Sequence, residues 1–238
     1  MKMPTAIMTG GAIRIGKAMA LHLAGKGFNI ALHYNQSNPS EVIKEIKSHG
    51  VRCIEYPCDL TKMDETGELI SKVIADFHDV ELLINSAANF IQENLEKTQK
   101  DTLTNTLYLN LMSPYLLMRD YKRSINKGMI INIIDERVRK HISTFAAYSV
   151  SKVGLKYLTE LAAVEWGKTV RVNGIAPGLI LPPQGGAPNY LEKAAKKIPT
   201  WNHGNTENLL QALDYLLENQ FVNGDTLFVD GGENWVRS

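Results

Sequence analysis

Two kinds of hydrophobic pattern alternate along the chain. Short runs rich in β-branched and other apolar residues are separated by longer segments whose apolar residues recur three and four positions apart. The short runs predict buried strands, and the longer spacing predicts amphipathic helices. The predicted strands cover residues 5–9, 29–34, 52–57, 82–85, 129–134, 170–175 and 226–229. The clearest predicted helices cover residues 15–24, 39–48 and 63–77.

This alternation of strands and helices predicts a single α/β domain that spans residues 1–238. Strand–helix–strand units form right-handed crossovers, which make the sheet parallel and place helices on both of its faces. We therefore expect a Rossmann-like, doubly wound sheet of about seven strands. Residues 178–204 interrupt the pattern with the sequence PGLILPPQGGAP and a lysine-rich stretch. An irregular segment near the carboxyl end of a strand is typical of a substrate lid.

Composition narrows the range of partners. The chain has 238 residues and a formal net charge of +1, so nothing favours nucleic acid or an anionic membrane as a partner. No apolar run approaches the roughly 18 residues of a membrane span. Cys53 and Cys58 are the only cysteines, and neither they nor the histidines show a metal-ligand spacing. We expect a cytoplasmic protein with reduced thiols and no metal site.

A glycine-rich turn, TGGAIRIG at residues 9–16, follows the first predicted strand. Gly10 and Gly16 suit a tight turn whose backbone amides, together with the start of the next helix, face a phosphate. Taken alone, this signal is weak, because small-residue turns after strands are common. Arg14 is unusual there, since a cation on the first turn of a helix opposes the helix dipole. Contact with a cofactor phosphate would explain why an arginine stands at this position. We predict that Ile15, the next residue, also contacts the cofactor.

The end of the second predicted strand indicates which cofactor binds. A domain of this type that binds NAD places an acidic residue there, on the ribose 2′-hydroxyl. Residues 33–37 contain no acid. The predicted contacts in this segment are His33, Tyr34, Asn35 and Ser37. Their neutral or cationic donors tolerate a 2′-phosphate, so we expect NADP(H).

Tyr148 and Lys152 stand four residues apart, which places them on one face of a helix. A nearby ammonium lowers the pKa of a phenol and lets it act as a general acid or base near neutral pH. Taken alone, a pair at this spacing is more often an ordinary surface pair. A catalytic role for these two residues therefore depends on the motifs around them.

Several motifs, in order, make the chain resemble the short-chain dehydrogenase/reductase family. They are the turn at residues 9–16, Asp59-Leu60, Asn85-Ser86-Ala87, Asn110, the Tyr148 and Lys152 pair, RVNGIAPG at residues 171–178 and FVNGDTLFVDGG at residues 221–232. The resemblance implies that Tyr148 donates a proton, while Lys152 binds the nicotinamide ribose and lowers the pKa of the tyrosine. It also implies that Asn110 supports a proton-relay water and that Asp59 contacts the adenine. The other cofactor contacts that it implies are Leu60, Asn85, Ser86, Ala87, Pro177, Gly178 and Leu179.

Two departures from the usual family pattern point to one branch of the family. Most members have a serine thirteen residues before the tyrosine, and here that position is Asp135. A carboxylate suits a developing alkoxide poorly because like charges repel, but it suits a C=N bond beside protonatable ring nitrogens. Glu136, the next residue, is also acidic, but strand alternation is expected to turn it to the opposite face from Asp135. Arg14 in the glycine turn is the second departure. Together, Asp135 and Arg14 resemble the pteridine reductases and, more closely, the bacterial dihydromonapterin reductases.

This closer resemblance implies a pterin substrate that is stacked against the nicotinamide by Phe90. The implied substrate contacts are Arg14, Phe90, Asp135 and Tyr148. We therefore predict an NADPH-dependent reductase of a dihydropterin, such as dihydromonapterin, dihydrobiopterin or dihydrofolate. Its predicted catalytic residues are Asp135, Tyr148, Lys152 and Asn110.

Two alternatives and one further implication remain. A carbonyl reductase, such as a 3-oxoacyl thioester reductase, has the same fold, but Asp135 argues against it. A non-catalytic NADP(H)-binding sensor needs no intact proton relay, so the presence of Tyr148, Lys152 and Asn110 together argues against that alternative. Gln36 stands where pteridine reductases often have an arginine for the 2′-phosphate, which weakens the expected preference for NADP. The resemblance also implies a homotetramer.

Overall fold

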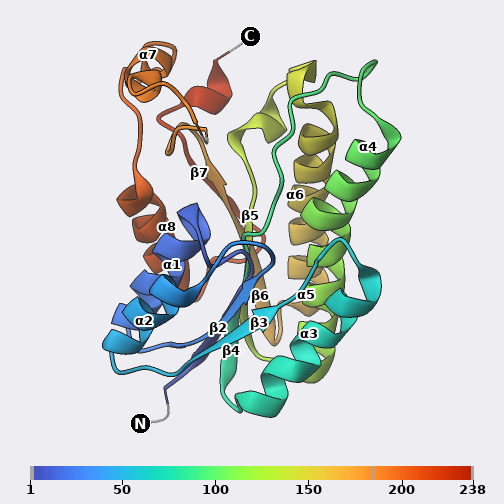
Figure 1. Ribbon diagram of the computed structural model, residues 1–238, viewed down its shortest axis with the longest axis vertical. Coiled ribbons are helices and arrows are strands. Elements are labelled where there is room, and N and C mark those ends of the chain that lie inside the picture. The colour runs from blue at the N-terminus through green and yellow to red at the C-terminus, as the bar shows by residue number, and fades with distance from the viewer. Residues whose placement is uncertain (1–2, 184, 237–238) are drawn as a thin grey trace.

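The computed structural model describes residues 3–183 and 185–236 (Figure 1). Within these ranges, seven parallel strands form one sheet in the order β3-β2-β1-β4-β5-β6-β7. The strands are β1 (Thr5–Met8), β2 (Asn29–Tyr34), β3 (Cys53–Pro57), β4 (Val80–Asn85), β5 (Gly128–Ile133), β6 (Val170–Pro177) and β7 (Thr226–Val229). The α-helices are α1 (Arg14–Gly25), α2 (Ser40–Ser48), α3 (Met63–Asp76), α4 (Lys100–Leu107), α5 (Ser113–Ser124), α6 (Ala146–Trp166), α7 (Tyr190–Ala195) and α8 (Thr206–Glu218). The single Rossmann-like, doubly wound domain that the sequence predicts is confirmed.

Each face of the sheet buries its own hydrophobic core, because successive residues of a strand point to opposite sides. In β1, Ala6 and Met8 pack with apolar residues of α1, α2 and α8, whereas Ile7 packs with those of α3, α5 and α6. Figure 1 shows the same division, with α1, α2 and α8 on one side of the sheet and α3 to α6 on the other. Strands covered on both faces are nearly continuous apolar runs, and this is why short apolar runs predict them.

Predicted and observed boundaries differ by small amounts. Each of the helices α1, α2 and α3 begins and ends within one residue of its prediction. Strand β4 begins two residues early because Val80 is buried in the core, although Glu81 beside it is exposed. Strand β6 continues two residues further than predicted, to Pro177, where it pairs with Val229.

The order of the strands reverses between β1 and β4. In doubly wound sheets, ligands bind at the carboxyl ends of the strands beside such a switch point. The segment 178–204, which contains α7, follows β6 at this same end of the molecule, at the top of Figure 1. The fold therefore brings the glycine turn, the chain after β5 and the irregular segment to one place.

Some sequence expectations concern the whole chain. No helix in the described ranges is long and apolar enough to cross a membrane. Among the same residues, no group of three or more His, Cys, Asp or Glu side chains is arranged to hold a metal ion. Cys53 and Cys58 are free and buried, and burial raises the pKa of each thiol to about 11. Both sulfurs therefore stay protonated at neutral pH.

Candidate active site

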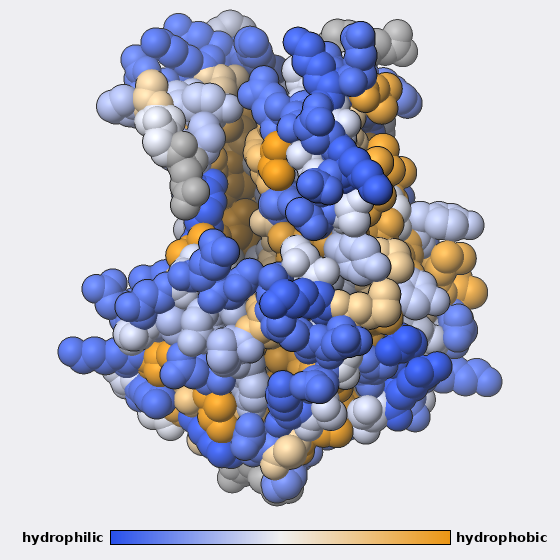
Figure 2. Space-filling view, turned by 45° about the vertical axis from the view of Figure 1, so that its right-hand side comes forward, coloured by the Kyte–Doolittle hydropathy of each residue, from blue (hydrophilic) through white to orange (hydrophobic). Residues whose placement is uncertain are grey.

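A cavity of about 930 Å³ lies at the carboxyl ends of the strands, next to the switch point. Figure 2 shows it as a cleft with hydrophobic side chains inside and hydrophilic ones around its mouth. The predicted site residues that line it are Gly10, Arg14, Ile15, Gly16, His33, Tyr34, Asn35, Ser37, Asp59, Leu60, Ser86, Ala87, Phe90, Asp135, Tyr148, Lys152, Pro177, Gly178 and Leu179. Predictions made from segments that are far apart in the sequence thus meet in one cavity. Asn85 and Asn110 are the two predicted residues that do not line it.

The glycine turn is packed too closely to hold side chains. Gly10 has a φ of 65°, and a Cβ on it would lie 2.9 Å from the Cα of Ala87. A Cβ on Gly16 would lie 2.2 Å from the carbonyl oxygen of Gly10. The turn therefore exposes backbone at the start of α1, which suits the close approach of a phosphate group.

Arg14 has a left-handed backbone, with a φ of 53°. A residue other than glycine in this conformation costs of order 1 kcal/mol, and such strain is concentrated at functional sites. The exposed guanidinium donates a hydrogen bond from Nη2 to the carbonyl oxygen of Pro182 at 3.0 Å. Arg14 thus joins the glycine turn to the segment 178–204.

His33 has a structural role in the turn. Its Nδ1 accepts a hydrogen bond from the backbone N–H of Gly10 at 3.1 Å, so its Nε2 carries the proton and donates to the carbonyl oxygen of Cys58 at 2.9 Å. Burial lowers the pKa of His33, which keeps the ring neutral. Both ring nitrogens have protein partners, which leaves Tyr34, Asn35, Gln36 and Ser37 as the other polar residues of this segment that line the cavity.

Tyr148 and Asp135 form a hydrogen-bonded pair in the cavity. The hydroxyl of Tyr148 donates to Oδ2 of Asp135 at 2.7 Å, and the backbone N–H of Arg137 donates to Oδ1 at 2.8 Å. Burial raises the pKa of Asp135, and these two hydrogen bonds oppose the rise. The carboxyl group is therefore both oriented and easier to protonate than an exposed aspartate.

The predicted effect on the pKa of Tyr148 is wrong in direction for the protein itself. Burial and the carboxylate of Asp135 raise the pKa of Tyr148 well above its usual value. The spacing to Lys152 suggests the opposite, but the ammonium lies 5.7 Å from the centre of the tyrosine ring and donates its hydrogen bond to the carbonyl oxygen of Ile133 at 2.7 Å. Tyr148 therefore holds its proton at neutral pH, as a proton donor must.

Lys152 is buried at the base of the cavity, with an exposed fraction of 3%. Burial lowers its pKa to about 8, although the charge of Asp135 favours the protonated form. The ammonium thus titrates close to neutral pH, far below an exposed lysine.

The aromatic side chains of Phe90 and Tyr148 line the cavity, and Phe145, which does not line it, packs on Phe90. The ring of Phe90 stacks on that of Phe145 with centroids 4.1 Å apart and meets Tyr148 edge-on at 4.6 Å. The guanidinium of Arg137 lies 4.8 Å from the centre of the Phe145 ring. Sequence reasoning missed Phe145 and Arg137. The available signal is their position, three residues before Tyr148 and two residues after Asp135.

The prediction that Glu136 faces away from Asp135 is wrong. Strand β5 ends at Ile133, and residues Glu136–Arg139 form a 3-10 helix, so strand alternation does not apply. Glu136 lines the cavity and pairs with Lys140 at 2.8 Å. Burial raises the pKa of Glu136 to about 7.

Asn110 and Asn85 do not line the cavity but form hydrogen bonds with the segments around it. Asn110 lies in a π-helical turn, Tyr108–Met112, and its amide exchanges hydrogen bonds with the backbone of Asn89 at 3.0 and 3.1 Å. It also donates to the hydroxyl of Ser151 on α6 at 3.2 Å. Asn85 donates to the side chain of Asn132 at 2.8 Å. These bonds hold the chain after β4 against α6, and the proton-relay role of Asn110 stays a prediction.

Asp59 lies at the adenine end that the resemblance implies. Its Oδ1 accepts hydrogen bonds from the hydroxyl and the backbone N–H of Thr61 at 2.8 and 3.0 Å. These bonds lower the pKa of Asp59, so its carboxylate is ionised at neutral pH and is fixed in position.

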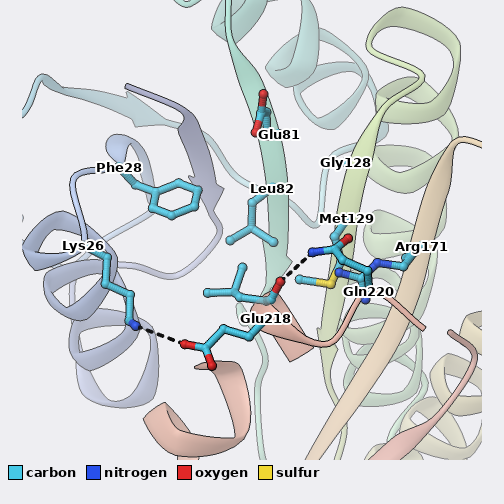
Figure 3. Close-up of a pocket in the computed structure, with 10 residues that line it drawn as sticks. Lys26, Phe28, Glu81, Leu82, Gly128, Met129, Arg171, Glu218 and Gln220 are labelled. Atoms are coloured by element: carbon cyan, nitrogen blue, oxygen red, sulfur yellow. Dashed lines mark hydrogen bonds and ion pairs between the residues drawn. The ribbon is translucent and has the colours of Figure 1, made fainter. Parts of the chain in front are cut away.

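A second cavity, of about 500 Å³, lies at the opposite end of the strands, where β4, β5 and β6 begin (Figure 3). Its charged groups have protein partners: Lys26 pairs with Glu218 at 4.0 Å, Glu81 pairs with Lys127 at 3.3 Å, and Arg171 donates to the carbonyl oxygens of Leu216 and Val222 at 3.0 and 2.9 Å. These contacts fasten the end of α8 to the sheet. No predicted site residue lines this cavity, and we assign it a structural role.

Comparison with known proteins identifies the class to which this fold and site belong. The family model described as enoyl-(acyl carrier protein) reductase matches residues 11–234. The chain belongs to the short-chain dehydrogenase/reductase family and is an oxidoreductase of that family.

Individual relatives within the family act on different compounds. A 2-dehydro-3-deoxy-D-gluconate 5-dehydrogenase of Escherichia coli strain K12 is 30% identical, over 95% of this chain and 94% of the relative. A dihydromonapterin reductase of Shigella boydii serotype 4 is 27% identical, over 96% and 95%. The solved structure of FolM alternative dihydrofolate reductase 1 from Brucella suis, in complex with NADP, superposes with a TM-score of 0.92 at 28% identity and covers 99% of this chain and 96% of its own.

Proposed function

We propose that this protein is an NADPH-dependent reductase that converts a dihydropterin to the tetrahydro form. The observation that carries the proposal is the hydrogen bond between Tyr148 and Asp135, at the position where most family members have a serine. A carboxyl group with a raised pKa can exchange a proton with a ring nitrogen, whereas it repels the alkoxide formed from a ketone. The similarity to a dihydromonapterin reductase and to the FolM structure supports the same substrate class.

The cavity fits a nicotinamide nucleotide with a 2′-phosphate. The crowded contact of Gly10, Gly16 and Ala87 leaves a backbone cradle that side chains would fill, and it is suited to the pyrophosphate. Asp59 would hold the adenine, and Lys152 would hold the nicotinamide ribose. The absence of acid in residues 33–37 favours NADPH over NADH, as does the NADP in the FolM structure.

The residues of this chain then supply position and protons. Bound NADPH would supply the hydride that reduces the carbon of the substrate C=N bond. Tyr148 gives its proton to the nitrogen of that bond, and Asp135 fixes the direction in which the phenol points. The phenolate left behind is neutralised by a proton that re-enters through Asp135 or Lys152. Phe90 provides a flat apolar face beside Tyr148 for the pterin ring.

Reduction assays on the wild-type protein test the proposal. NADPH consumption is followed with dihydromonapterin, dihydrobiopterin, dihydrofolate and an acetoacetyl thioester. We expect turnover with at least one dihydropterin and little with the thioester. Good turnover of the thioester without any dihydropterin activity would identify a carbonyl reductase, and NADPH binding without turnover of any substrate would favour a sensor.

A further inference from the structure

Helix α7 presents one side to the mouth of the cavity. Tyr190 and Lys193 lie three residues apart on α7, Lys197 lies in the turn that follows the helix, and all three residues line the cavity. Ala195 and Ile198 are buried on the other side, with exposed fractions of 4% and 3%. Burial of these two residues fixes the orientation of the segment, so its aromatic and cationic side faces the cavity.

The two lysines on this face have no counter-charge. Within the described residues, neither the ammonium of Lys193 nor that of Lys197 takes part in an ion pair or a side-chain hydrogen bond. By contrast, Lys140 pairs with both Glu136 and Glu233, which line the same cavity. In those two pairs, the one ammonium of Lys140 is shared between two carboxyl groups. The cavity mouth thus carries an unpaired positive charge next to an aromatic ring.

A pterin with a polyhydroxyl side chain offers these groups hydroxyls for hydrogen bonds, but no anion and no second aromatic ring. The ring is uncharged, and a polyol carries neither an aromatic face nor an anion. A substrate whose side chain holds an aromatic ring followed by carboxylates matches the order Tyr190, Lys193, Lys197 along α7 and the turn that follows it. The aminobenzoyl-glutamate tail of a folate has this chemistry.

We propose that Tyr190, Lys193 and Lys197 form a subsite for the aryl-carboxylate tail of a folate-type substrate, so that dihydrofolate is bound by its tail as well as by its pterin ring. The inference rests on the proposed function, because the pterin ring must lie at Tyr148 for the tail to reach α7. Tyr190 packs against the aromatic ring of the tail, and the two ammonium groups bind its carboxylates.

The experiment compares substrates that differ only in their tails. Initial rates are measured for the full-length wild-type protein and for the double variant Lys193→Gln, Lys197→Gln, with dihydrofolate, dihydropteroate and dihydromonapterin. Lys196→Gln is the matched control, because Lys196 lies between the two lysines in the sequence and does not line the cavity. The affinity for NADPH is measured separately by fluorescence titration.

We expect the double variant to raise the KM for dihydrofolate about 3- to 20-fold, the effect of losing two exposed ion pairs. The KM should rise less for dihydropteroate, which has a single carboxylate, and should change less than about twofold for dihydromonapterin. Raising the salt concentration should weaken dihydrofolate binding in the wild type and not in the double variant. Tyr190→Ala should raise the KM for both aryl substrates and leave dihydromonapterin unaffected.

Other outcomes overturn the inference in distinguishable ways. A weaker affinity for NADPH, with equal changes for all substrates, would assign the lysines to the cofactor phosphates. An unchanged KM for dihydrofolate, or a wild type that reduces dihydromonapterin but not dihydrofolate, would reject the subsite and leave the proposed function standing. A wild type that reduces no dihydropterin would reject both.

Discussion

Replacing Asp135 by serine removes the group that distinguishes this site from that of a carbonyl reductase. In the structure, the carboxylate accepts hydrogen bonds from Tyr148 at 2.7 Å and from the backbone of Arg137 at 2.8 Å. A hydrogen bond to a charged group contributes about 1.5–3 kcal/mol, so losing the bond that orients Tyr148 lowers the rate about 10- to 100-fold. If Asp135 also transfers a proton, the loss reaches about 10,000-fold.

The pH dependence of the same variant has a definite sign. The carboxylate of Asp135 is one of the causes that raise the pKa of Tyr148. Asp135→Ser removes that charge, so the pKa of Tyr148 falls and the phenol loses its proton at a lower pH. If proton donation by Tyr148 limits the rate, the decline in activity at alkaline pH begins earlier in the variant than in the wild type.

The assay is the ratio of two activities. We would measure kcat/KM for dihydromonapterin and for an acetoacetyl thioester from the loss of NADPH absorbance, in the wild type, in Asp135→Ser and in Asp135→Asn. Asparagine keeps the shape and can still accept the bond from Tyr148, so it separates charge from orientation. NADPH affinity should stay the same, because Asp135 does not belong to the phosphate-facing turn. A ratio that Asp135→Ser leaves unchanged would refute the role of this residue in substrate choice.

Three other predictions follow from the site. Tyr148→Phe should lower turnover at least about 100-fold and leave NADPH affinity unchanged in a direct titration; near-normal turnover would make Asp135 the proton donor. NADPH should bind about 10- to 100-fold more tightly than NADH, and equal binding of the two would contradict the assignment of the 2′-phosphate to residues 33–37. Lys152, with a pKa of about 8, releases its proton at lower pH in the folded protein than in the unfolded chain. Its contribution to the free energy of unfolding should therefore rise by up to about 3 kcal/mol between pH 8 and pH 10.5, which denaturant titrations of the wild type and Lys152→Met would detect.

Much of the fold could be predicted because its determinants are local. The apolar runs of the strands and the three- and four-residue spacing of α1, α2 and α3 are visible in a single sequence, and the strand–helix alternation then allows few topologies. Local departures from regular geometry could not be predicted in the same way. The π-helical turn at Tyr108–Met112 turns Asn110 toward Asn89 and Ser151, and no periodicity signals it.

The candidate site shows the same limit for electrostatics. Motif order brought Asp135 and Tyr148 together in the prediction, but the sign of the shift in the pKa of Tyr148 depends on burial and on which charge is nearer. The four-residue spacing to Lys152 gives no information on how deeply Tyr148 is buried or on which charge lies nearer to it. Glu136 was assigned to the wrong side for a related reason, because the end of β5 could not be located to the residue. The lysine-rich stretch near residue 193 was recognised in the sequence, whereas the side of α7 that faces the cavity required the structure.

The bond from Arg14 to Pro182 connects two parts of the chain that are 168 positions apart. One guanidinium serves both the turn at the start of α1 and the segment 178–204, so a ligand that draws it away from the Pro182 carbonyl also loosens that segment. Thermodynamic linkage makes this effect reciprocal. A contact that favours the bond between Arg14 and Pro182 weakens the binding of such a ligand by the same free energy. Arg14 thus couples occupancy of the turn to release of the segment, because the ligand and the Pro182 carbonyl compete for a single cation.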